Sequence, residues 1–229
     1  MDIFGQALRD EYLNGGADTL WLHNSYDTPE EMPVDIFFRK EEDMSDLEYK
    51  ALEMCYGKVL DIGAGAGSHA LELQNKSLEV IALDLSAAAI QIMQQRGVKN
   101  VVEQDLNSYM GAGFDTVLLL MNGIGITGSL EGLKTFLQKA KTFLHPDGQL
   151  IFDSSDISYL YQAIAKPVEK YFGEIAYQYE YKGAKGEWFN WLYIDEHMLI
   201  SIAEECGWHC EIVLDDGQDQ YLAQLTLKT

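Results

Sequence analysis

The chain has few cysteines and few positive charges, and each shortage excludes some classes of protein. Cysteine accounts for 3 of its 229 residues, an odd number that excludes a fully paired disulfide framework. Lys and Arg total 16 against 37 Asp and Glu, which gives a formal net charge of −21. A surface of this charge without a basic cluster repels nucleic acid and anionic membranes. We therefore expect neither as a partner.

Targeting signals and long apolar runs are also missing. The first residues carry no basic region followed by an apolar core, which a signal peptide needs. The longest apolar run, around Val117 to Met121, is far too short to span a bilayer. The sequence predicts a soluble, cytoplasmic protein.

Several catalytic and metal-binding motifs are absent as well. The sequence contains no Gly-x-x-x-x-Gly-Lys-Ser/Thr loop, no Gly-x-Ser-x-Gly elbow and no His-Glu-x-x-His helix. Cys206, His209 and Cys210, with His197 nearby, lie across a predicted helix end and strand. They lack the two separated ligand pairs of a structural zinc site. We predict no metal site.

What the sequence does have is a glycine-rich turn between a strand and a helix. The apolar run 59–62, which includes Asp61, leads into Gly63, Gly65 and Gly67 before an Ala/Leu-rich helical pattern. Alternate glycines allow a sharp turn and a close approach by a ligand. A dinucleotide fingerprint needs its third glycine three residues after the second, but that position is Ser68.

Strand and helix patterns alternate along the rest of the chain, which is typical of an α/β fold. The expected strands are 59–62, 78–84, 100–103, 114–121, one after the Pro146-x-Gly148 turn, 208–214 and 221–227. Helices are expected at 1–15, 44–55, 70–75, and after the capping residues Ser86, Ser129 and Asp195. Residues 17–42 are read as a short helix or loop. Period-two alternation around a glycine turn predicts a hairpin at about 172–194.

Asp61-x-Gly63-x-Gly65-x-Gly67 resembles motif I of the class I S-adenosylmethionine-dependent methyltransferases. The resemblance implies a three-layer α/β/α sandwich around a seven-stranded, mostly parallel sheet of order 3-2-1-4-5-7-6. Strand 7 would run antiparallel. Residues 1–56 would form a helical cap over the cofactor and substrate site, and residues 57–229 the methyltransferase domain with the inserted hairpin.

The resemblance also implies a cofactor site for S-adenosylmethionine, whose product is S-adenosylhomocysteine. Asp84 ends the second strand, where a carboxylate accepts both ribose hydroxyls. Asp105 resembles the acid near the adenine amino group, although it also fits an ordinary Asx turn. The full set is Asp61, Gly63, Ala64, Gly65, Gly67, Asp84, Leu85, Asp105, Leu106 and Asn122. Asn122 either orients a substrate or satisfies the backbone of its own glycine turn. His69 could approach the site, but we expect it in solvent.

Substrate-pocket candidates come from three places. In the N-terminal segment they are His23, Tyr26, Phe38 and Arg39, which alternatively only anchor a cap or lie in solvent. Asp153 and Asp156 end the fifth strand, and we expect one to reach the substrate and the other to cap residues 157–161. Trp191 belongs to the hairpin, which forms a lid, a substrate wall, a subunit contact or a simple cover for the core.

The resemblance implies methyl transfer to a small-molecule acceptor by in-line displacement, in a monomer or homodimer. No catalytic base is identified. Two other classes stay open. One is a different enzyme on the same sheet, such as an aminopropyl transferase or an NAD-dependent oxidoreductase. The other is a cofactor-binding protein without catalysis.

Overall fold

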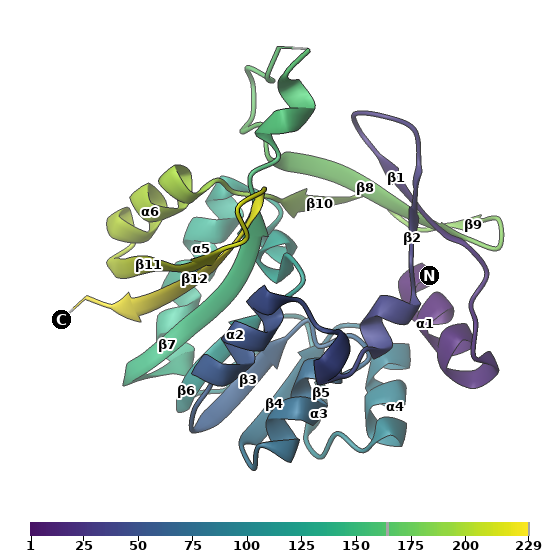
Figure 1. Cartoon of the computed structure of the whole chain (residues 1–229), viewed down its shortest axis with the longest axis horizontal. Helices are drawn as coiled ribbons and strands as arrows, with labels where there is room; N and C mark the ends of the chain where they lie inside the picture. Colours follow the sequence, from purple (N-terminus) through teal and green to yellow (C-terminus); the bar gives the residue numbers. More distant parts are fainter. Residues whose placement is uncertain (164, 229) are drawn as a thin grey trace. The chain divides into compact units, whose positions relative to one another are not determined.

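The computed structural model, drawn in Figure 1, describes residues 1–163 and 165–228. The chain divides into two compact units. The first unit comprises Met1–Met44, Leu60–Tyr109 and Ala176–Phe189. The second comprises Ser45–Val59, Met110–Ile175 and Asn190–Thr229. Each unit therefore draws on segments that are far apart in the sequence.

The larger sheet has seven strands in the order β11-β12-β7-β6-β3-β4-β5. Their bounds are β3 (Lys58–Ile62), β4 (Glu79–Asp84), β5 (Val101–Glu103), β6 (Phe114–Leu119), β7 (Leu144–Ser155), β11 (Trp208–Asp215) and β12 (Gln220–Leu227). β4 and β5 are parallel, as are β6 and β7, whereas β12 runs antiparallel to both β7 and β11. This confirms the predicted order and the antiparallel last strand.

The helices next to this sheet begin where the sequence predicts. In the first unit, α3 (Ser68–Asn75) packs on β4, and α4 (Ala87–Arg96) on β4 and β5. In the second unit, α2 (Asp46–Met54) packs on β7, β11 and β12. There α5 (Leu130–Phe143) packs on β6 and β7, and α6 (Glu196–Glu205) on β11. Ser86, Ser129 and Asp195 each accept a hydrogen bond from a backbone N–H in the first turn of α4, α5 and α6.

One local prediction is wrong, because the segment around Pro146 is not a turn before the strand. β7 begins at Leu144, opposite Phe114, while Gln149 lies opposite Thr116. The residues between Leu144 and Gln149 therefore form a bulge within the strand pair. Proline has no N–H to donate to the ladder, so this irregularity is where a strand tolerates it.

A second, smaller sheet includes two strands that the sequence did not predict. Its order is β10-β8-β1-β2, and β9 pairs with β8. The bounds are β1 (Leu20–Asn24), β2 (Glu30–Met32), β8 (Glu174–Tyr181), β9 (Ala184–Lys185) and β10 (Phe189–Leu192). The hairpin predicted at 172–194 is confirmed. The short helix or loop expected for 17–42 is wrong over β1 and β2, because β1 pairs antiparallel with the distant β8 from Leu20↔Tyr181 to Asn24↔Tyr177.

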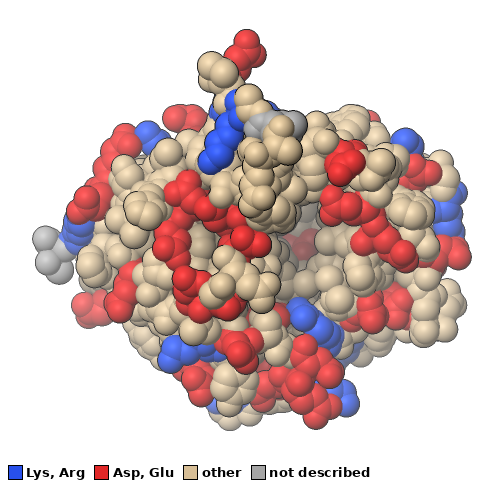
Figure 2. Space-filling view, turned by 45° about the horizontal axis from the view of Figure 1, so that its top comes forward, with Lys and Arg blue, Asp and Glu red and all other residues tan. Residues whose placement is uncertain are grey.

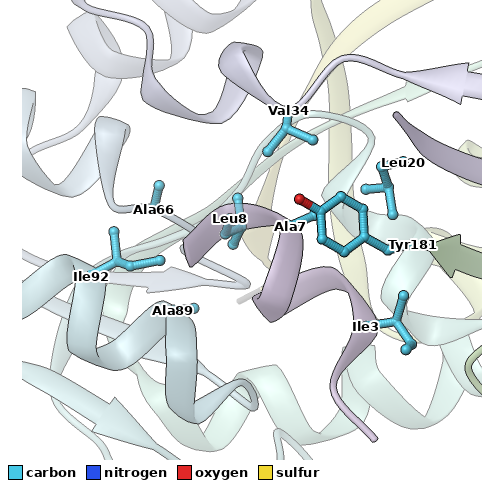
Figure 3. Packing of buried hydrophobic residues seen from close by; sticks show 9 residues of the cluster. All are labelled: Ile3, Ala7, Leu8, Leu20, Val34, Ala66, Ala89, Ile92 and Tyr181. Atoms are coloured by element: carbon cyan, nitrogen blue, oxygen red, sulfur yellow. The ribbon is translucent and has the colours of Figure 1, made fainter. Parts of the chain in front are cut away.

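The N-terminal helix α1 (Ile3–Asn14) is built into the core of the first unit, as Figure 3 shows. Nine buried residues form this cluster: Ile3, Ala7, Leu8, Leu20, Val34, Ala66, Ala89, Ile92 and Tyr181. They come from α1, β1, the glycine turn, α4 and β8, together with the residue before the short helix η1 (Asp35–Phe38). Burial of this apolar surface holds the N-terminal segment onto the glycine turn.

Among the described residues, no helix has both the length and the apolar character needed to cross a membrane.

Candidate functional site

The turn between β3 and α3 has the backbone geometry that only glycine adopts readily. Gly63, Gly65 and Gly67 have φ angles of 71°, 55° and 83°, all in the left-handed region. A Cβ on Gly67 would meet Met93 Cγ at 2.8 Å, whereas a Cβ on Gly63 would meet nothing within 4 Å. The turn is therefore packed against the protein at Gly67 and open at Gly63.

Asp84, at the end of β4, is held in place by this turn. Its Oδ2 accepts a hydrogen bond from Gly65 N–H at 2.8 Å, and its Oδ1 accepts one from Ser86 N–H at 2.8 Å. A carboxylate has about four lone-pair sites, so each oxygen keeps the capacity for another donor. The backbone thus orients Asp84 and leaves it able to accept two hydroxyls.

Asp61, on β3 before the glycines, is a buried acid. It is 2% exposed, and its Oδ2 has no hydrogen-bond partner among the residues that the structure describes. Burial raises the pKa of Asp61 to about 6, His69 lowers it and Asp84 raises it further. His69 is itself 8% exposed, so the expectation that it lies in solvent is wrong. The first turn of α3 carries its ring inward.

Two residues at the turn were not singled out from the sequence. The Phe37 ring lies 3.8 Å from where a Cβ on Gly65 would stand, and Phe37 O accepts a hydrogen bond from Ser68 Oγ at 2.7 Å. Arg96 Nη1 donates to Ala66 O at 2.6 Å. Phe37 comes from a segment without clear periodicity, and a basic residue in the last turn of a helix normally signals only a favourable helix end. The sequence therefore carried little signal for either.

Asp105 and the two leucines of the predicted adenine and ribose region lie on loops of the first unit. Asp105 Oδ1 accepts a hydrogen bond from Asn107 N–H at 2.7 Å, which is the Asx turn that the sequence also allowed. Leu85 follows Asp84 and is 68% exposed, while Leu106 is half-buried. Apolar side chains such as these, next to the carboxylate at the end of β4, could contact the faces of a flat ring.

The four pocket candidates of the N-terminal segment all contact other side chains or backbone groups of the first unit. His23 Nε2 lies 2.7 Å from Glu180 Oε2, across the β1–β8 pair, and Tyr26 Oη donates to Glu30 Oε1 at 2.7 Å. The Phe38 ring stacks on Tyr12 and carries the Arg96 guanidinium 5.1 Å from its centroid. Arg39 Nε donates to Ile36 O at 2.9 Å. These contacts fit the anchoring alternative, and the pocket role stays a prediction.

The second unit brings together polar groups at the ends of β6 and β7. Asn122 has a φ of 55°, and its N–H donates to both carboxylate oxygens of Asp153, each at 2.9 Å. Ser155 Oγ donates to Asn122 Oδ1 at 2.8 Å. Asp156 Oδ1 accepts from Ser158 N–H at 2.8 Å, at the start of the short helix η4 (Ser158–Tyr161), although the N-cap of η4 is Ile157. The substrate role of Asp153 stays a prediction.

Trp191, of β10, packs against the short helix η3 (Gly123–Thr127) within the second unit. A Cβ on Gly125 would lie inside the indole ring, because Trp191 sits directly on the Gly125 backbone. The aromatic hairpin thus packs at least this one half-buried side chain onto η3. Its role toward a substrate stays a prediction.

The arrangement of the possible metal ligands is defined over the part of the chain that the structure describes. In that part of the chain, no group of three or more His, Cys, Asp or Glu side chains is arranged to hold a metal ion. Cys206 is buried and Cys210 is half-buried, and burial raises the pKa of the Cys210 thiol to about 12. A thiol in that state is a poor metal ligand.

Comparison with known proteins identifies the family. Residues 59–148, from the glycine-turn strand into β7, match the family described as a methyltransferase domain. Over its whole length the chain is 40% identical to the S-adenosylmethionine-dependent methyltransferase of Bacteroides fragilis, solved in complex with S-adenosylhomocysteine. That match has a TM-score of 0.93 and covers 95% of the Bacteroides chain. The chain belongs to the S-adenosylmethionine-dependent methyltransferases.

Two further similarities are more distant. The chain is 28% identical over 140 residues to YqeM of Bacillus subtilis, a candidate methyltransferase; the match spans 48% of this chain and 54% of YqeM. The sugar N-methyltransferase KedS8 of a Streptoalloteichus species is 17% identical, with a TM-score of 0.61 over 90% of this chain and 97% of KedS8. The second similarity shows the shared fold alone.

The residues of the first unit fit the cofactor of this family. The open face at Gly63 and the Oδ2 of Asp61, which has no partner among the described residues, belong to the β3–turn–α3 segment, and the oriented carboxylate of Asp84 ends the next strand, β4. Such a turn receives a nucleotide-like ligand through its backbone N–H groups. Because the chain belongs to the methyltransferases, the two other enzyme classes left open by the sequence, an aminopropyl transferase and an NAD-dependent oxidoreductase, are no longer needed.

Proposed function

We propose that this protein transfers a methyl group from S-adenosylmethionine to a small-molecule acceptor by in-line displacement. The observation that carries the proposal is the glycine turn with Asp84 fixed beside it by Gly65 and Ser86. The bound cofactor supplies an electrophilic methyl group on a sulfonium. The protein's part is to align the acceptor and exclude water, so that proximity provides much of the rate.

We assign the methionine portion of the cofactor to the glycine turn. It is surrounded by Gly63, Ala64, Gly65 and Gly67, with Asp61 beneath them. Asp84 accepts the two ribose hydroxyls, one on each oxygen. Around the adenine, Leu85 and Leu106 provide apolar contact, and Asp105 accepts from the amino group through the oxygen that its Asx turn does not use.

The acceptor wall is proposed from a row of aromatic rings in the first unit. Starting at Phe37 beside Gly65, the row continues to Phe4, Tyr179 and Phe189, with successive centroids 4.9, 5.4 and 5.0 Å apart. These spacings are those of favourable aromatic pairs. All four rings are half-buried, so each keeps surface available for a ligand. This arrangement supports an acceptor with an apolar face.

The charge of the protein supports a small molecule over a nucleic acid. Figure 2 shows acidic side chains over much of the visible face, with Lys and Arg in small separate groups. At a net charge of −21, approach to a phosphate backbone costs free energy unless a basic face compensates. We also propose a cytoplasmic location, because Cys55, Cys206 and Cys210 form no disulfide with one another in the part of the chain that the structure describes. A monomer and a homodimer are both compatible with the proposal.

The test is methyl transfer from labelled cofactor to a metabolite panel, with total RNA and a protein extract run in parallel. We expect label in one class of small molecules. With that acceptor, Phe189→Leu should raise KM severalfold while the affinity for S-adenosylhomocysteine stays unchanged. Phe172→Leu, whose ring packs on Tyr161 and Tyr171 outside the row, is the control. Label in RNA or protein alone would contradict the small-molecule proposal.

A further inference from the structure

Arg96, the last residue of α4, reaches back to the glycine turn. Its Nη1 donates to Ala66 O at 2.6 Å and lies 3.2 Å from Ser68 Oγ. Ala66 stands between the second and third glycines of the turn, and Ser68 begins α3. One guanidinium group therefore bridges the end of one helix and the start of the preceding one.

The same guanidinium contacts a segment that we call the strap, residues 34–39. Arg96 Nη2 lies 3.5 Å from Phe38 O, and the guanidinium carbon is 5.1 Å from the centroid of the Phe38 ring. Ser68 Oγ, which Arg96 also contacts, donates to Phe37 O at 2.7 Å. Two carbonyl groups and one ring of the strap are thus tied to the turn through Arg96 and Ser68.

The strap covers one side of the turn. Phe37 lies against Gly65, and its ring meets the edge of Phe4 from α1 at 4.9 Å. Val34, at the other end of the strap, is buried in the core cluster of Figure 3. Gly63, by contrast, has open space in front of it. A ligand that enters on the Gly63 side would find the Gly65 side already closed by the strap.

We propose that Arg96 is a positioning residue of the methyltransferase: it fastens the strap over the glycine turn and so sets how tightly and how long the cofactor is held. This inference rests on the cofactor site proposed above. Arg96 acts through Ala66, Phe38 and Ser68 and does not touch the reacting atoms. The strap forms one wall of the site, and loosening it weakens contacts that the bound cofactor makes, so we expect the main effect of Arg96 on dissociation.

Arginine is suited to this task and lysine is not. The planar guanidinium presents several N–H donors in a fixed fork and stacks on an aromatic face at the same time. Lysine carries the charge but places one ammonium on a flexible stem. Arg96→Lys should therefore keep the charge near Glu72 and Tyr12 and lose the simultaneous contacts with the turn and the strap.

The test compares Arg96→Lys, Arg96→Met and the control Arg9→Lys, an exposed arginine of α1. For each full-length variant, calorimetry gives the Kd of S-adenosylhomocysteine, stopped-flow displacement gives its dissociation rate, and hydrogen exchange follows the strap amides. We expect Arg96→Met to raise the dissociation rate at least about tenfold, because hydrogen bonds from a charged donor typically carry that much free energy. Arg96→Lys should give a smaller increase, Arg9→Lys none, and the strap amides should exchange faster in both Arg96 variants.

The outcomes separate this inference from the proposed function. Normal affinity and dissociation rate in a folded Arg96→Met variant would overturn the role of Arg96 while leaving the cofactor site intact. Failure of the unaltered protein to bind S-adenosylhomocysteine would overturn the cofactor site itself. If Arg96→Met does not fold, Ser68→Ala removes the hydroxyl that links Arg96 to Phe37, and an unchanged dissociation rate in that variant would equally overturn the proposal.

Discussion

Asp84 is the single residue on which the cofactor assignment depends most. Backbone N–H groups, among them those of Gly65 and Ser86, hold its two oxygens in a fixed orientation. Asp84→Asn keeps the shape but replaces one acceptor oxygen by a donor. We expect at least a tenfold loss of affinity for S-adenosylhomocysteine, since a charge-assisted hydrogen bond carries about 1.5–3 kcal/mol. Calorimetry measures the change, with the exposed Asp43→Asn as the control.

An unchanged affinity in folded Asp84→Asn would remove Asp84 from the ribose. The melting temperature of the variant checks that it is folded, because Gly65 and Ser86 lose a charged acceptor.

The raised pKa of Asp61 should make the free energy of unfolding depend on pH. Burial raises its pKa in the folded protein to about 6 from an ordinary value of 3.8. Because the folded state holds the proton more tightly than the unfolded state, the stability from this group is full below the ordinary pKa and is lost as pH rises through 6. Asp61→Asn cannot titrate, so its stability relative to the wild-type protein should rise by about 2 kcal/mol between about pH 4.5 and pH 7.5.

Urea denaturation at the two pH values measures this difference. A gap between the two proteins that does not change with pH would show that Asp61 titrates normally.

Single residues also mark the limit of prediction from the sequence. Asp61, Asp84 and the glycines were predicted because their proposed roles depend on order and spacing along one continuous strand–turn–helix–strand segment. Phe37 and Arg96 were missed because their contacts join segments about thirty residues apart. His69 was placed in solvent because nothing local indicates which way the first turn of α3 faces. Packing between remote segments decides such orientations.

Among the secondary-structure elements, those with strong local signals were predicted and those defined by distant partners were not. Ser86, Ser129 and Asp195 each cap a helix, as expected from the residue type and the apolar pattern that follows. β1 and β2 were read as a short helix or loop, because neither short stretch shows a clear alternation. β1 becomes a strand by pairing with β8, more than 150 residues away, and local sequence does not encode that pairing.

The pairing of β1 with β8 is tied to α1 by one buried hydroxyl. Tyr181, which is 1% exposed, donates to Asp10 Oδ2 at 2.9 Å and accepts from Asp18 N–H at 3.2 Å. Tyr181→Phe removes both bonds and keeps the ring, so we expect a loss of about 1–2 kcal/mol in the free energy of unfolding. Urea denaturation measures it.

Tyr26→Phe is the matched control, because it removes one exposed hydrogen bond to Glu30. We expect less than about 0.5 kcal/mol from it. Equal effects of the two substitutions would show that the Tyr181 hydroxyl does not tie the small sheet to α1.

For the whole molecule, the sequence predicted the strand order because family resemblance and alternating elements agree along most of the chain. The larger sheet has that order, with β12 antiparallel as its next-to-last strand. The acceptor was not predictable, since its recognition depends on side chains contributed by segments remote in sequence.

The central claim is that this chain binds S-adenosylmethionine at its glycine turn. The most direct test is thermal unfolding with and without S-adenosylhomocysteine, with NAD as the comparison ligand. At about 100 times its Kd, S-adenosylhomocysteine should stabilise the fold by roughly 2.7 kcal/mol and raise the melting temperature by several degrees. NAD should leave the melting temperature unchanged. A shift with NAD and none with S-adenosylhomocysteine would contradict the account.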